Sequence, residues 1–338
     1  LLFLINFFYT FFFLFYFTKN KKLLLYLYAL KSNYFIIPKY FKSFYFTYKK
    51  LGLTRKDHIL FPTGRRKDLA LINFLSKIDI YHPKFHFRMS IPEKNRFKGF
   101  FYYLKQIDHN LKNRNIFIYI WRDNFKSFLK NTLNKKGIYK TDLMFSYNPN
   151  LNFKRKLKNT SHVIGYLGHA RKERGFHYLP KLIKLLEKKN NKFKYLIQFS
   201  KINKDLISTR KDLYKLCIKN KRIKLIDKYS DHNEFIKHLK KIDIMPILHD
   251  PNEINNITSG TAYSCVPYEI PTILPYGTSY MSSINKFKSF EKAKNIENMA
   301  NKIIKISKNY KYYLKNAKLN SKLLTRIIDN DPLVKNLS

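Results

Sequence analysis

Glycine, acidic side chains, cysteine and tryptophan are all scarce in this sequence. Its 338 residues include 9 glycines, 2 cysteines and 1 tryptophan, and only 22 Asp and Glu against 67 Lys and Arg. Cys217 and Cys265 are too few for a disulfide framework and have no metal-ligand spacing, so they indicate a reducing compartment. The chain is longer than one ordinary core supports, and 45% of its residues are hydrophobic. We therefore expect a folded protein of two domains.

The shortage of acidic residues leaves a formal net charge of +45, which is typical of proteins that bind nucleic acid or an anionic membrane surface. The lysines are spread along the chain rather than gathered in one block, and Lys, Asn, Ile, Phe and Tyr are abundant together, the pattern that an AT-rich genome produces. The sequence has no aromatic-basic RNA motif and no helix-turn-helix pattern. We interpret most of the charge as solvated surface with a weak attraction to membranes. A nucleic-acid-binding protein without catalytic activity is the alternative.

The first 17 residues, LLFLINFFYTFFFLFYF, are apolar and are followed by Lys19, Lys21 and Lys22. This run is at the lower length limit for a bilayer span, and a signal peptide would carry its positive charges before the run rather than after it. We expect a buried element or a membrane-surface helix, with a true span as the alternative. Because Leu1 stands where an initiator methionine is expected, we also expect the N-terminal domain to lack its start.

Strand-like and helical patterns alternate along the chain. In the first half, we expect strands at residues 58–62, 84–90, 116–120 and 142–145, and helices at 22–51 with a break at Pro38, 68–77 and 124–133. In the second half, we expect strands at 162–167, 195–199, 223–226, 242–248 and 272–274, and helices at 179–188, 204–219, 230–241, 261–268 and 296–324. The polar, basic segment 148–159 between the halves is a linker candidate. This alternation predicts two parallel, doubly wound α/β sheets.

Three of the nine glycines lie in one segment, GYLGHARKERG, at residues 165–175. It separates a strand ending near Leu167 from a helix beginning near Leu179. Glycine permits a tight turn and close approach of the backbone to a ligand, and a helix start offers unpaired N–H groups to an anion. Arg171 and Arg174 add planar donors suited to phosphate. The segment is neither a Walker A loop nor a spaced GxGxxG. It indicates a phosphate contact, and a basic surface turn is the alternative.

A second segment, residues 258–263 (TSGTAY), follows the strand expected at 242–248. Ser259, Gly260 and Thr261 lie where the next helix begins, and small residues with hydroxyl groups at a helix start form an anion site or an ordinary N-cap. Ligands of open parallel sheets bind beyond the carboxyl ends of the strands. Two such sites on two crossovers of one domain therefore predict a diphosphate ligand.

Residues 164–279 resemble the donor domain of GT-B glycosyltransferases, especially the large retaining family 4. GYLGHARKERGFHYLPKLI is similar to that family's glycine turn followed by Arg and Lys/Arg-Gly. KIDIMPILHDPNEINNITSGTAYSCVPYEIPTILPYGT is similar to its strand, acidic loop, Ser-Gly turn and Pro-flanked strand. The N-terminal half resembles the family only in general organisation. The resemblance implies two Rossmann-like domains whose parallel, doubly wound sheets face a central cleft. The expected division is an acceptor-side domain at 1–150, a linker at 151–160, a donor domain at 161–325 and a tail at 326–338.

The resemblance also implies an activity. A retaining, hexosyl-type glycosyltransferase would move a sugar from a nucleotide-diphosphate sugar to a glycan or lipid-linked acceptor, in cell-surface glycan or polysaccharide synthesis. It would be cytoplasmic and peripheral at the inner face of the membrane, with no nucleic-acid partner. Because arginines and helix starts would stabilise the leaving diphosphate, we expect no metal and no other cofactor. The triplet Asp329-Asn330-Asp331 mimics a metal-binding DxD, but it follows a basic helix and is interpreted as a solvated helix end.

The family's functional positions can be carried over onto this sequence. On the donor side they fall on Gly168, Arg171, Arg174, Ser259, Gly260 and Thr261, with Glu253 and Glu269 as the nearby carboxylates. Glu269 stands where the family commonly has Gly, and Ser264 stands where a ribose-binding Glu is usual. On the acceptor side the candidates are Thr63, Gly64, Arg65 and Arg88, after two expected strands. His86 is the candidate proton acceptor, and a buried strand residue is the alternative.

Overall fold

A computed structural model describes residues 43–47, 50–64, 66–78, 82–89, 115–121, 137–141, 153–157, 161–189, 192–249, 259–278 and 285–337. The chain divides into two compact units, residues 1–141 with 335–338 and residues 142–334. Every described strand pair is parallel, as the alternation of strands and helices predicts. Residues 153–157, which we expected to belong to a linker, are part of the second unit.

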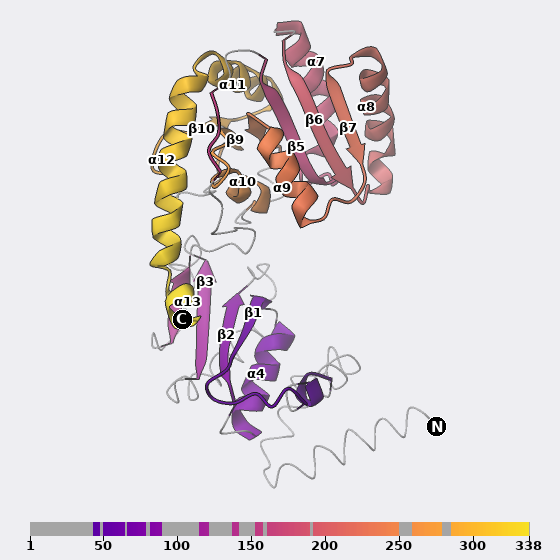
Figure 1. The fold of residues 1–338 in the computed structure, drawn as a ribbon. Coiled ribbons are helices and arrows are strands. Elements are labelled where there is room, and N and C mark those ends of the chain that lie inside the picture. Colours follow the sequence, from indigo (N-terminus) through magenta and orange to yellow (C-terminus); the bar gives the residue numbers. More distant parts are fainter. Residues whose placement is uncertain are drawn as a thin grey trace, which may run out of the picture. The chain divides into compact units, whose positions relative to one another are not determined.

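The first unit contains a four-stranded parallel sheet in the order β1-β2-β3-β4 (Figure 1). Its strands are β1 (His58–Gly64), β2 (Lys84–Met89), β3 (Ile116–Trp121) and β4 (Ile138–Thr141), and α4 (Arg66–Ile78) connects β1 to β2. The side chains of Phe85, Phe87 and Ile118 on one face, and of His86 and Tyr119 on the other, are fully buried, as in a parallel sheet covered on both faces. The sequence did not predict β4. The strand expected at 142–145 and the helix expected at 124–133 lie outside the described residues.

The described residues of the second unit form six parallel strands. They are β5 (Val163–His169), β6 (Lys194–Ser200), β7 (Ile223–Asp227), β8 (Met245–Pro246), β9 (Thr272–Pro275) and β10 (Phe290–Ala293). An isolated parallel bridge between Ile164 and Ile244 joins the β5-β6-β7 ladder to the β10-β9-β8 ladder. The resulting order is β10-β9-β8-β5-β6-β7, so the chain builds outward from β5 in one direction and then from β8 in the other. This is the doubly wound arrangement that the sequence predicts.

Strand β8 is shorter than the expected strand at 242–248. Met245 and Ile247 donate toward β9, so position 246 faces β5, and because Pro246 has no N–H group to donate, regular pairing with β5 stops there. Extended chain continues on both sides, because the Ile247 N–H donates to the Ile273 carbonyl oxygen at 2.8 Å and the Gly165 N–H donates to that of Ile244 at 3.0 Å. A Cβ on Gly165 would lie 2.4 Å from Cδ1 of Ile242, so only glycine lets β5 approach this segment so closely.

The helices of the second unit follow the expected positions with three differences. They are η2 (Phe176–Tyr178), α7 (Leu179–Lys189), η3 (Lys204–Leu206), α8 (Ile207–Lys219), α9 (His232–Lys241), α10 (Gly260–Cys265), α11 (Ile296–Lys308), α12 (Tyr310–Asp329) and α13 (Pro332–Leu337), the last of which ends in the first unit. The helix expected at 261–268 ends at Cys265, the one expected at 296–324 is divided at Asn309, and the expected tail is helical. Asp231 caps α9 by accepting from the Glu234 N–H at 2.8 Å, as its capping-box pattern predicts.

The apolar start of the chain, residues 1–17, lies outside the described residues. Within the part that the structure describes, no helix is long and apolar enough to cross a membrane.

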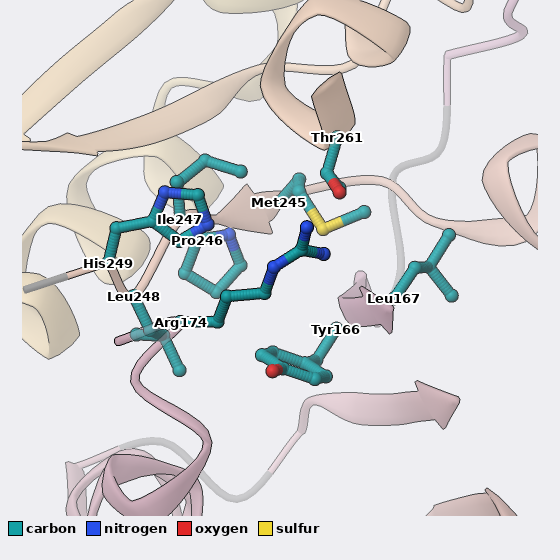
Figure 2. Close-up of a pocket in the computed structure, with 9 residues that line it drawn as sticks. All are labelled: Tyr166, Leu167, Arg174, Met245, Pro246, Ile247, Leu248, His249 and Thr261. Atoms are coloured by element: carbon teal, nitrogen blue, oxygen red, sulfur yellow. The ribbon is translucent and has the colours of Figure 1, made fainter. Parts of the chain in front are cut away.

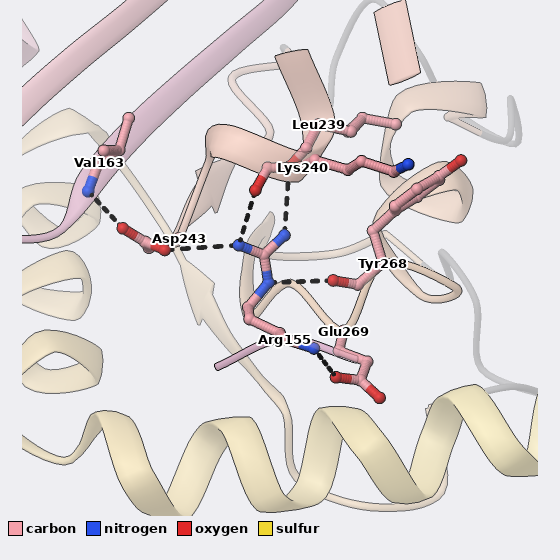
Figure 3. Close-up of polar contacts among 7 residues, drawn as sticks. All are labelled: Arg155, Val163, Leu239, Lys240, Asp243, Tyr268 and Glu269. Carbon is pink, nitrogen blue, oxygen red and sulfur yellow. Dashed lines mark hydrogen bonds and ion pairs between the residues drawn. The ribbon is translucent and has the colours of Figure 1, made fainter. Parts of the chain in front are cut away.

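Arg155 anchors residues 153–157 to the second unit (Figure 3). Its side chain is 3% exposed and lies 3.4 Å from the fully buried carboxylate of Asp243. The guanidinium also donates to three backbone carbonyl oxygens, those of Leu239, Lys240 and Tyr268. The second oxygen of Asp243 accepts from the Val163 N–H at 2.9 Å, where β5 begins. A buried ion pair is tolerated when its remaining donors and acceptors are satisfied in this way.

Candidate functional site

A pocket lies at the carboxyl ends of β5 and β8, where the strand order of the second unit reverses. It is lined by Tyr166 and Leu167 of β5, residues 245–249 of the β8 segment, Arg174 and Thr261 (Figure 2). In open parallel sheets, the point at which the strand order reverses leaves a crevice between the loops on either side, and ligands bind there. The pocket therefore occupies the position at which this fold binds ligands.

Two glycines shape the loop that follows β5. Gly168 has φ +135°, and a Cβ there would lie 3.0 Å from Nη1 of Arg174. Gly175 has φ +69°, and a Cβ there would lie 1.9 Å from the Leu248 carbonyl oxygen. Both positions favour glycine because other residues rarely adopt positive φ. Gly175 thus lets the loop close against the end of the β8 segment, which brings Arg174 to the pocket.

The guanidinium of Arg174 points into the space between Tyr166, Met245 and Thr261 (Figure 2). No carboxylate among the described residues forms an ion pair with it. Burial and then the nearby Arg174 charge lower the pKa of His249, which also lines the pocket, to about 4. At neutral pH the pocket therefore presents one guanidinium beside a neutral imidazole, which favours an anionic ligand.

The two segments that the sequence assigns to phosphate meet in this pocket, because Arg174 comes from one and Thr261 from the other. Ser259 is the N-cap of α10 and is 2% exposed, and its Oγ accepts from the Ala262 N–H at 3.2 Å. Its hydroxyl group is thus engaged in capping. Gly260 begins the helix, and Thr261 in the first turn faces the pocket.

Other predicted donor-side residues do not line the pocket. Arg171 is partly exposed and lies 3.7 Å from the Glu173 carboxylate. Glu269 is 7% exposed, and its Oε2 accepts from the Arg155 N–H at 2.8 Å. Glu269 has φ +55°, a left-handed conformation that glycine adopts without strain. The Ser264 Oγ donates to the Gly260 carbonyl oxygen at 2.9 Å, and Glu253 lies outside the described residues.

His86, the expected proton acceptor, is completely buried in the first unit's sheet. Its Nε2 lies 2.9 Å from Nδ1 of His58, and its Nδ1 lies 2.8 Å from the Tyr119 hydroxyl oxygen. Burial, with smaller effects from His58 and Lys84, lowers its pKa to about 4. The ring is therefore neutral at pH 7 and has no exposed edge with which to contact an acceptor.

The remaining acceptor-side candidates lie around the ends of β1 and β2. Gly64 ends β1, and a Cβ there would lie 2.3 Å from Cε2 of Phe87, so its absence of a side chain serves packing. Arg88 is partly exposed on β2. The side chain of Thr63 and the whole of Arg65 lie outside the described residues.

Sequence reasoning did not assign His249 or Tyr166 to the site. His249 had a usable signal, since it is the first polar residue after the apolar run IMPIL, at the carboxyl end of an expected strand. Tyr166 had none, because an aromatic residue inside an apolar strand has the pattern of an ordinary core residue.

A comparison with protein-family models and one with curated proteins both give no match. Solved structures do match. A glycosyltransferase from Rickettsia africae ESF-5 is 15% identical, with 95% of this chain and 82% of that chain covered and a TM-score of 0.61. HepE from Anabaena, in complex with UDP, is 12% identical, with 83% and 76% covered and a TM-score of 0.57. Sucrose-phosphate synthase from Thermosynechococcus elongatus is 11% identical, with 86% and 74% covered and a TM-score of 0.54. The chain thus has the GT-B fold that the sequence resemblance implies.

Proposed function

We propose that this chain is a glycosyltransferase that moves a sugar from a nucleoside-diphosphate sugar to an acceptor hydroxyl group. The observation that carries the proposal is the position of Arg174, which lies in a pocket at the reversal of a doubly wound sheet with no described carboxylate paired to it. A guanidinium in such a place suits a diphosphate. In support, one solved structure with this fold holds UDP.

In the proposed reaction, the bond between the anomeric carbon of the sugar and the diphosphate oxygen breaks. The acceptor oxygen forms the new bond to that carbon and releases its proton to the solvent, and the diphosphate leaves with increased negative charge. Arg174 and the N–H groups at the start of α10 would stabilise that charge more in the transition state than in the ground state. Because these donors are a guanidinium and amides, the site as proposed neutralises the leaving group without a metal.

The finer features of the proposal rest on the sequence alone, through its resemblance to the family, its cysteine content and its charge. They are a hexose donor, retention of configuration, a glycan or lipid-linked acceptor, a role in cell-surface glycan or polysaccharide synthesis, and a cytoplasmic location at the inner membrane face.

The proposal is tested by calorimetric titration of the full chain with UDP, GDP and ADP. Arg174→Met should weaken binding of the preferred diphosphate by about 10- to 100-fold, the loss expected for a charge-assisted hydrogen bond to phosphate. The matched control is Lys172→Met, because Lys172 is an exposed cation of the same loop that does not line the pocket. It should change binding by less than about twofold, since exposed charges are screened.

Turnover is read by release of the diphosphate from the matching nucleotide sugar, which Arg174→Met should lower at least as much as binding. The proposal fails if no nucleoside diphosphate binds the wild-type chain. Salt-sensitive binding of RNA or DNA without nucleotide binding would instead favour the nucleic-acid alternative.

A further inference from the structure

Helix α8 exposes large apolar side chains along one face. Ile207 is 46% exposed, Tyr214 41% and Ile218 73%. Their separations of seven and four residues place them on one side of the helix, over about 16 Å of its length. Thr209 and Leu213, which lie away from this side, are buried. Among the described helices, no other presents more than one exposed large apolar residue. We call these three residues the α8 ridge.

Cations surround the α8 ridge. Residues 201–222 contain eight Lys or Arg and two Asp. Arg210 and Arg222 pair with Asp227 and Glu187, but six lysines remain exposed: Lys201, Lys204, Lys211, Lys215, Lys219 and Lys221. Lys211 is four residues after Ile207, and Lys215 is three before Ile218, so both lie beside the ridge.

We infer that the α8 ridge docks on an anionic lipid bilayer. Apolar side chains that reach below the headgroups leave water, while the lysines beside them meet anionic headgroups and extend their own apolar stems along the interface. A bilayer supplies both environments at once. Nucleic acid would satisfy the lysines but would give the isoleucines no apolar surroundings, and a second copy of this chain would bring another +45 charges to the contact.

The exposed apolar ridge, and not the positive charge, distinguishes α8 from the other described helices. Lysines occur all over this protein, and α12 carries exposed Lys311 and Lys315 at the same four-residue spacing as Lys211 and Lys215. Its face exposes one large apolar residue, Tyr312, at 53%. Helix α12 therefore provides a matched control of similar charge without a ridge. The inference deepens the membrane location proposed above and does not depend on glycosyl transfer, because none of these side chains lines the proposed nucleotide pocket.

The test is co-sedimentation of the full chain with vesicles of phosphatidylcholine alone or mixed with phosphatidylglycerol, at low and high salt. The wild type should bind the mixed vesicles and lose most binding at high salt, because added salt shortens the screening length. Two double variants test the ridge and the lysines separately: Ile207→Ser with Ile218→Ser, and Lys211→Glu with Lys215→Glu. Each should weaken binding to the mixed vesicles by about tenfold or more. The two α12 control variants are Tyr312→Ser alone and Lys311→Glu combined with Lys315→Glu. Their binding to the mixed vesicles should stay within about twofold of that of the wild type.

An unchanged circular dichroism spectrum and an unchanged UDP affinity would show that the α8 variants are folded. An unchanged UDP affinity would also keep the vesicle result separate from the test of the proposed function. An equal loss in the α12 controls would overturn the inference, because general charge would then be the cause. Full binding by the α8 variants would also overturn it and would place the contact elsewhere, for example at residues 1–17. A third result would also overturn the inference. It is the absence of binding to vesicles together with binding of RNA that depends on Lys211 and Lys215.

Discussion

Gly175 occupies the most crowded position in the loop between β5 and α7. Its positive φ and its closeness to Leu248 combine two separate requirements for glycine. Gly277, after β9, shares the first requirement only, since its φ is +83° and nothing lies within 4 Å of a Cβ built there. Substitutions at these two glycines therefore distinguish the cost of backbone strain from the cost of a steric contact.

We predict that Gly175→Ala destabilises the second unit by about 3 kcal/mol or more, because positive φ strain adds to the displacement of the Leu248 backbone. Gly277→Ala should cost about 1 kcal/mol, the strain alone. Urea unfolding followed by circular dichroism measures both. Gly175→Ala should also weaken UDP binding, because the loop carries Arg174 to the pocket. Equal destabilisation by the two variants would show that the Leu248 contact relaxes at no cost.

At the scale of elements, Arg155 connects parts of the second unit that lie far apart in the sequence. It joins residues 153–157 to the end of α9 and the turn after α10, and through Asp243 to the first residue of β5. Removing the guanidinium would leave the Asp243 carboxylate buried without its counter-charge. A lone buried charge is far more costly than a matched pair.

We predict that Arg155→Met lowers the free energy of unfolding of the second unit by about 3–5 kcal/mol. Adding Asp243→Asn should recover part of this loss, since the buried charge is then gone, whereas a loss due to packing alone would not be recovered. Arg210→Met is the control because the Arg210–Asp227 pair, at 2.6 Å, lies in a more exposed setting and should matter much less. Thermal and urea unfolding of the wild type and these three variants measure the differences.

At the scale of the whole molecule, every residue of the candidate pocket belongs to the second unit, whereas the only tryptophan, Trp121, lies in β3 of the first. Tryptophan fluorescence therefore reports the first unit, and binding at the proposed site would act on the second. Units with separate cores can unfold in separate transitions.

We predict that UDP raises the unfolding midpoint of one calorimetric transition and leaves the midpoint of tryptophan fluorescence unchanged. At a ligand concentration of about 100 times Kd, the second unit should gain about 2.7 kcal/mol. An equal shift of the fluorescence midpoint would show that the two units unfold together. Arg174→Met should remove the shift at the same UDP concentration.

Much of the second unit could be predicted from its sequence because its patterns are local. Apolar runs and helical spacing located β5, β6, β7, α7, α8 and α9, and the Asp231 cap followed from a three-residue pattern. The glycines of the 165–175 segment located the loop at the pocket. The sequence did not predict β10 or β4, since these four-residue strands, FEKA and IYKT, are half polar and form no apolar run, unlike the equally short TILP of β9.

The sequence by itself determined the parallel α/β class, the positions of most strands and helices, and the two segments that supply Arg174 and Thr261. Only the tertiary structure decided which side chains face the pocket. Arg171 and Arg174 look alike in sequence, but Arg174 reaches the crevice and Arg171 lies beside Glu173. Likewise His86 is buried by its neighbours on β1 and β3. The physical reason is that periodicity is a property of a short segment, whereas burial and direction depend on residues distant in the chain.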